Sequence, residues 1–136
     1  MSSVGKSTED EGYRQVMLVA ANTRQVVLTL MADNKLDALV YATFDYQPPR
    51  IAPDVMTKPV VDDVTGLGNN RRLSPALGFP ALTVPAGFTT DGLPVGLEFM
   101  GRPYADATLL KFGYAYEQKT HHRKPPASTP GLRGEP

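Results

Sequence analysis

The chain has 136 residues, of which 41% are hydrophobic, and its 14 basic residues balance its 14 acidic ones. This size suits one small domain. The balanced charge argues against a strong electrostatic attraction of the whole chain to nucleic acid or to an anionic membrane. The absence of cysteine excludes disulfides, thiolate metal sites and a cysteine nucleophile.

The amino-terminal third predicts a flexible head over residues 1–8, then a helix and a strand. Ser7 and Thr8 are expected to cap the helix, with acidic residues in its first turn. Apolar residues then recur at three- and four-residue spacing from Tyr13 to Met31, which indicates one apolar stripe. The segment "ADNK" ends this helix, and "LDALVYATF" predicts a short buried strand. A helix followed by a buried strand is typical of an α/β fold.

Residues 47–72 show no sustained period. Irregular connections of this length are unusual inside a compact domain, where they tend to be functional or disordered. We therefore expect this segment to lie across another part of the molecule, inside or outside this chain.

Residues 81–99 predict a β-hairpin. One strand places alternate apolar residues on one face, and the next strand does the same. These residues are Leu82, Val84, Ala86 and Phe88, then Leu93, Val95, Leu97 and Phe99. Asp91-Gly92 between the strands suits a turn that needs positive φ. The opposite face is rich in alanine, glycine and proline, which predicts close approach of a helix, a backbone or a ligand.

A second helix is expected roughly over residues 105–121. Its apolar side is predicted to comprise Leu109, Phe112, Gly113 and Tyr116, widened by Leu110 and Tyr114. Basic residues follow at its negative end, and residues 125–136 read as an extended tail. The expected domain spans residues 9–124.

Several consecutive motifs carry a family resemblance. They are "GFPA" at residues 78–81, "VPAG" at 84–87, "GLPVGL" at 92–97, and Leu109-Leu110 leading to Glu117. Over residues 9–126 the chain resembles the carboxy-terminal part of amidase signature enzymes. The segment "YEQKTHHRKPP" is more similar to small-amide amidases than to the A-type subunits of tRNA-dependent amidotransferases.

This resemblance implies part of a mixed α/β sheet covered by helices, in the order helix, strand, long loop, hairpin, helix. It also implies carboxamide hydrolysis through an acyl-enzyme, with a serine activated by a second serine in a cis peptide and by an unprotonated lysine. A weak hydroxyl needs such a base, and a Gly-rich turn supplies N–H groups to the oxyanion. The resemblance places these parts in a Gly-Gly-Ser-Ser-Gly segment and a lysine upstream of the matched region.

The chain contains no such segment. Ser2-Ser3 with Lys6 is the only similar group, and its position at a terminus predicts mobile serines beside a protonated lysine. Ser74 with a histidine lacks the sequence context of a nucleophile elbow. We therefore predict no catalytic residue, no cofactor and no metal in this chain. His121-His122 would diverge on a helix, and capping of the helix end explains them better than a shared metal.

The candidates for contact with a substrate pocket are Asn69, Asn70, Arg71 and Arg72, which immediately precede the hairpin region. The alternative interpretation of these four residues is loop capping and surface charge. Glu98 needs a partner if the sheet is buried on both sides, and Arg102 is near in sequence. We expect Glu98 to have a structural hydrogen-bonding role.

Alternative functions remain open. The first is the C-terminal fragment of an amidase, inactive alone and paired with its missing amino-terminal portion. The alternative is a non-catalytic module that forms a homo-oligomer, or complements a separate amidase half, through exposed sheet edges. A fragment of an amidotransferase A-type subunit is a further alternative. We favour the first. A small amide is then the substrate of the complete enzyme only, and no nucleic acid or membrane partner is expected. The lack of an apolar signal core or a run of ~20 apolar residues predicts a cytoplasmic location.

Overall fold

The computed structural model describes residues 7–47, 53–54, 56–57, 70–126 and 128–129. The elements are α1 (Glu11–Asp33), β1 (Ala38–Ala42), η2 (Asn70–Arg72), α2 (Leu73–Leu77), β2 (Ala81–Phe88), β3 (Pro94–Gly101) and α3 (Asp106–Thr120). The predicted order of long helix, strand, hairpin and helix is confirmed. The short helices η2 and α2 were not predicted, and most of the 47–72 connection lies outside the described residues. No helix of the described part is long and apolar enough to span a membrane.

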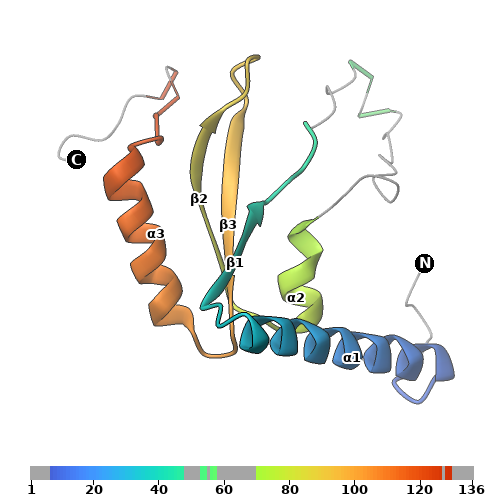
Figure 1. The fold of residues 1–136 in the computed structure, drawn as a ribbon. Helices are drawn as coiled ribbons and strands as arrows, with labels where there is room; N and C mark the ends of the chain where they lie inside the picture. Colours follow the sequence, from blue (N-terminus) through green and yellow to red (C-terminus); the bar gives the residue numbers. More distant parts are fainter. Residues whose placement is uncertain (1–6, 48–52, 55, 58–69, 127, 130–136) are drawn as a thin grey trace.

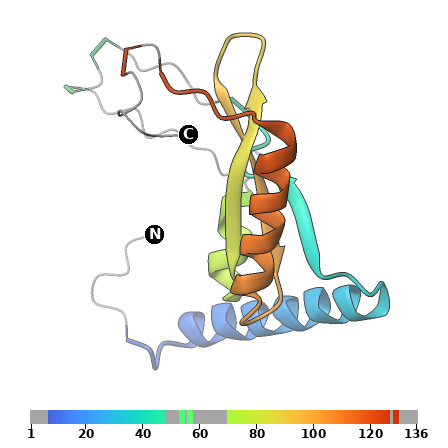
Figure 2. The ribbon, with the colours of Figure 1, turned by 90° about the vertical axis from the view of Figure 1, so that its left-hand side faces the viewer.

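The three strands form one antiparallel sheet in the order β1-β3-β2. Helix α3 covers one face of this sheet, α2 lies on the opposite side, and α1 runs across the lower end (Figures 1 and 2). Because β3 is central, β1 and β2 each keep one edge without a partner strand in the described part of the chain.

The hairpin turn forms as predicted, whereas the face assigned to Phe88 was wrong. Gly92 adopts φ 80°, and the Thr89 N–H donates to the Leu93 carbonyl at 2.8 Å. The pairing register shifts between Pro85 and Gly87, which makes a β-bulge. Pro85 has no N–H for the ladder, and the extra residue moves Phe88 to the opposite face, opposite Pro94.

Helix α1 begins at a different cap from the predicted one. The Asp10 carboxylate accepts a hydrogen bond from the Gly12 N–H at 2.8 Å, as expected of an N-cap residue. Ser7 instead accepts from the N–H of Glu9 within a turn that precedes the helix. Asp10 takes the cap because its side chain lies next to the first free N–H groups of the helix.

Two buried clusters lie on the two faces of the sheet. On the face opposite α3, Met100 packs with Leu77 and Phe79, and α1 adds apolar side chains from its carboxy-terminal half. On the α3 face, the cluster is built on Val84, Phe99 and Leu109. The sheet is therefore the middle layer of the described part.

Helix α3 packs through the side that was predicted. Leu109 is buried, Phe112 and Tyr116 pack on the same cluster, and Gly113 lies against Leu82 of β2. Leu110 and Tyr114 do not widen this face, because they are 62% and 67% exposed.

Strand β1 is less buried than predicted. Val40 pairs with Phe99 across the sheet, and both side chains lie on the same face. Val40 is nevertheless 52% exposed. Helix α3 packs over β2 and β3 and leaves the edge strand β1 uncovered.

Candidate functional site

The most buried charged side chain in the described part is Glu98, on the sheet face opposite α3. Its side chain is 5% exposed. The Tyr41 hydroxyl donates to Glu98 Oε1 at 2.9 Å, and the Thr83 hydroxyl lies 3.5 Å from Oε2. The strand pairing positions this row, because Tyr41 and Thr83 are the residues directly opposite Glu98 on β1 and β2. The Thr43 hydroxyl extends the row, 3.3 Å from that of Thr83.

The predicted pairing of Glu98 with Arg102 is wrong. One guanidinium nitrogen of Arg102 donates to the carbonyls of Met31 and Leu36, both at 3.1 Å. Arg102 follows the end of β3 and reaches the carboxy-terminal end of α1, where a cation stabilises free carbonyls. Glu98 is satisfied by hydroxyl groups instead.

Burial raises the pKa of the Tyr41 hydroxyl above its ordinary value, and the hydrogen bond and the negative charge of Glu98 raise this pKa further. A hydroxyl held in this way stays protonated and donates. The row of Tyr41, Glu98 and Thr83 therefore crosslinks three strands by hydrogen bonds, and the Tyr41 hydroxyl acts in it as a donor.

This raised pKa predicts a loss of stability at alkaline pH. A folded-state pKa above the unfolded value of about 10 contributes stability that is complete below pH 10. That contribution is lost as the pH rises from about 10 toward the folded-state pKa, because the unfolded state ionises first. Urea unfolding of the chain between pH 8 and pH 11 should show this decline, and Tyr41→Phe should lack the Tyr41 part of it. A wild-type and a Tyr41→Phe chain with the same alkaline decline would contradict this prediction.

Three of the four predicted pocket residues, Asn70, Arg71 and Arg72, form η2. The Asn70 side-chain amide donates to the Ala42 carbonyl at 3.0 Å, so it ties the end of β1 to the start of the α2 region. Arg72 is exposed, Asn69 lies outside the described residues, and for Arg71 only the backbone is described. The contact of Asn70 is a loop-capping contact, and contact of these residues with a substrate stays a prediction.

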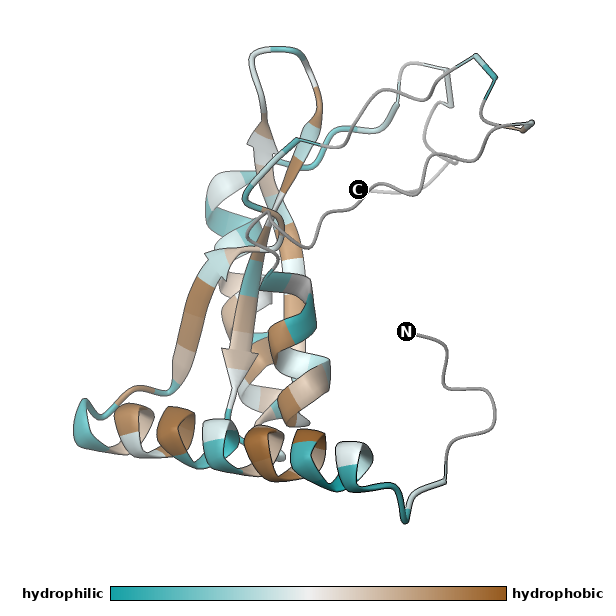
Figure 3. Cartoon of the chain, turned by 90° about the vertical axis from the view of Figure 1, so that its right-hand side faces the viewer, coloured by the Kyte–Doolittle hydropathy of each residue, from teal (hydrophilic) through white to brown (hydrophobic). Residues whose placement is uncertain are grey.

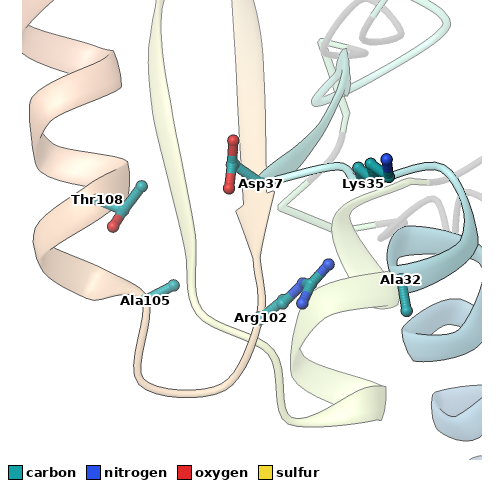
Figure 4. Close-up of a pocket in the computed structure, with 6 residues that line it drawn as sticks. All are labelled: Ala32, Lys35, Asp37, Arg102, Ala105 and Thr108. Atoms are coloured by element: carbon teal, nitrogen blue, oxygen red, sulfur yellow. The ribbon is translucent and has the colours of Figure 1, made fainter.

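Neither of two surface grooves in the described part is lined by Asn70 or Arg72. One of about 440 Å³ lies between the end of α1 and the start of α3, where Lys35, Asp37, Arg102 and Thr108 line it (Figure 4). The other, of about 690 Å³, lies beside the hairpin tip. Its lining combines Phe88 and several prolines and glycines with basic residues that follow α3, among them Lys124, whose ammonium lies 5.6 Å from the Phe88 ring centre.

The groups considered for nucleophilic chemistry do not assemble in the described part. Ser74 is buried inside α2, and its carbonyl accepts from Phe79 N–H at 3.0 Å. His121 is the left-handed C-cap of α3, and the His122 ring lies 6.2 Å from that of Tyr116. No group of three or more metal-ligating side chains occurs among the described residues. Ser2, Ser3 and Lys6 lie outside the described residues.

Sequence reasoning missed the partners of Glu98. The signal was present, because Tyr41 is the polar aromatic residue of an otherwise aliphatic strand and Glu98 is the only charge of β3. Finding the pair required the pairing of β1 with β3, across a long stretch of intervening chain.

Comparison with known proteins identifies the family. The family model "Amidase" matches residues 2–110. The chain belongs to the amidase family. It is 56% identical over 55 residues to the A-type subunit of a glutamyl-tRNA(Gln) amidotransferase from Desulforudis audaxviator, and 40% identical over 86 residues to a fatty acid amide hydrolase of Medicago truncatula. These matches cover 40% and 62% of this chain, but 11% and 14% of the relatives.

Solved structures confirm the predicted α/β fold of this amidase-family chain. The peptide amidase of Stenotrophomonas maltophilia matches 91% of the chain at 30% identity with a TM-score of 0.65, and the match covers 23% of that structure. An amidase-family protein of Bacillus anthracis matches 90% of the chain at 31% identity with a TM-score of 0.63, covering 19% of that structure. The chain thus spans a small part of the length of its relatives.

Proposed function

We propose that this chain is the carboxy-terminal structural portion of a carboxamide hydrolase, and that residues outside it supply the serine nucleophile and its base. The match of the amidase family model over residues 2–110 carries this proposal. The chain contributes a three-stranded part of the sheet and the helix that covers it. By itself it hydrolyses no amide.

The surface of the described part supports this proposal. Large apolar side chains of α1 and of the open strand β1 are exposed, among them Val19 at 63% and Val40 at 52%. Both outer strands also keep an edge free for a further strand in the described part. Exposed sheet edges and large apolar patches favour association, and in folded proteins other segments or partner proteins usually cover them. The remainder of an amidase fold is a suitable cover.

A second candidate is a non-catalytic module that forms a homo-oligomer. The free edges of β1 and β2 in the described part favour it, because strand addition joins two sheets through main-chain hydrogen bonds. It predicts a well-behaved oligomer that needs no amidase partner.

Hydrolysis of a panel of aryl and alkyl amides by the purified chain tests these functions. We expect no turnover above buffer for the chain alone. We expect turnover when it is combined with the Stenotrophomonas maltophilia peptide amidase from which the part matching this chain has been removed. That amidase portion alone is the control. Turnover by the chain alone, lost in Ser2→Ala or Ser3→Ala, would overturn the proposal.

A further inference from the structure

Helix α1 carries a second apolar stripe that nothing covers in the described part of the chain. Its members recur at alternating intervals of three and four residues, the spacing of one side of a coiled coil. They are Val16, Val19, Thr23, Val26 and Leu30, here called the seam. The four aliphatic members are 46–66% exposed, and apolar residues line much of α1 in Figure 3.

The seam is suited to contact with another helix. Its polar member, Thr23, donates its hydroxyl hydrogen to the Val19 carbonyl at 2.8 Å, so its hydroxyl is satisfied without a partner from outside. The flank beyond Val19 and Val26 carries uncharged side chains, namely Gln15, Asn22 and Thr29. Between Gln15 and Leu30, this side of α1 therefore offers a partner an apolar surface without a charge that would select an acidic or a basic one.

The seam alone is too small to hold a second copy of the chain. Stable interfaces between separate proteins use roughly 20–30 residues on each side, and the seam provides five. A partner that also binds other parts of the chain can use the seam as one part of a larger interface.

The amino-terminal half of α1 also indicates a partner that contacts the chain at more than the seam. Tyr13 and Met17 lie on the stripe that packs under the sheet through Val27 and Met31, yet they are 47% and 51% exposed. Helix α1 extends beyond the sheet, so its amino-terminal half has apolar residues on two adjacent sides and no neighbour among the described elements (Figure 1). A body that fills the space beside this half contacts both stripes at once.

We propose that the seam is the docking surface for a helix of the amidase body, the part of an amidase that this chain does not contain. In the peptide amidase structure, this chain matches only 23% of the length, so most of that protein lies outside the match. The inference rests on the proposed function, and it identifies the seam of α1 as the surface that contacts the amidase body.

Binding of the chain to the amidase body tests the seam. The probe is the Stenotrophomonas maltophilia peptide amidase without the part that matches this chain, and the readout is its dissociation constant with the wild-type chain. The double variant Val19→Lys/Val26→Lys should weaken binding at least tenfold, because two ammonium groups would enter an apolar contact. Leu18→Lys is the matched control, since Leu18 is 57% exposed on the same helix but lies outside the seam. It should change binding less than twofold.

Lysine favours the helix more than valine does and about as much as leucine does, so α1 should remain folded in both variants, and circular dichroism checks this. Equal effects of the seam variant and of Leu18→Lys, or no binding by the wild-type chain, would overturn the inference. A dimer of the chain alone that the seam variant dissociates would assign the seam to a second copy and also overturn it. Seam-dependent binding without amide turnover would instead contradict the proposed function and leave the docking surface intact.

Discussion

Replacing Met100 by alanine is expected to lower the free energy of unfolding by about 2–5 kcal/mol. Met100 is fully buried and packs with Leu77 and Phe79 in the cluster opposite α3. Truncation removes the thioether and leaves a cavity between the sheet, α1 and α2, which the surrounding backbone cannot close fully. Urea unfolding followed by circular dichroism measures the change.

Two further variants separate this packing effect from a general effect of losing methionine. Met100→Leu keeps the volume and should cost less than about 1.5 kcal/mol. Met56 is 92% exposed, so Met56→Ala should stay within about 0.5 kcal/mol of the wild-type chain. A Met100→Ala chain as stable as Met56→Ala would show that this cluster does not hold the sheet on α1 and α2.

Replacing Gly113 by valine is expected to lower the free energy of unfolding by about 1–3 kcal/mol or more. A Cβ at this position would overlap the end of the Leu82 side chain and lie 3.3 Å from Val84 Cγ1, so either Leu82 would have to repack or α3 would have to move away from β2. Gly113→Ala should cost less than valine, because alanine favours the helix by about 1 kcal/mol over glycine and offsets part of the overlap.

The control for Gly113 is a valine on the solvent side of the same helix. Ala115 is exposed, and Ala115→Val changes only helix propensity, by less than about 0.7 kcal/mol. The urea midpoints of the three variants and the wild-type chain compare directly. Stabilisation by Gly113→Val would show that α3 does not approach β2 as closely as described.

Local patterns predicted the candidate site only in part. The hairpin motif located β2 and β3, because alternation and an Asp-Gly turn are short-range signals. For Glu98 the sequence predicted only that a partner is needed if both faces of the sheet are buried. The partner was predicted from sequence distance, and Arg102 is only four residues away. Tyr41 is the actual donor, and it is far from Glu98 in sequence but opposite to it in the sheet.

The bulge shows the same limit within a single strand. Strict alternation predicted one face for Leu82, Val84 and Phe88, yet one extra residue after Pro85 reversed the side on which Phe88 lies. The missing N–H of Pro85 was visible in the sequence. The position of the β-bulge that accommodates this missing hydrogen bond depends on how β2 pairs with β3.

The sequence by itself determined the long helix, the hairpin with its turn, the α3 side that packs on the sheet, and the family resemblance. Each of these depends on residues close together along the chain, through periodicity, turn chemistry or consecutive motifs. Only the tertiary structure decided that β1 is an edge strand, that Glu98 meets Tyr41, that Arg102 caps α1, and that α1 keeps an apolar seam exposed. These features depend on which distant segments become neighbours, and the energy of burying a side chain is set by those neighbours.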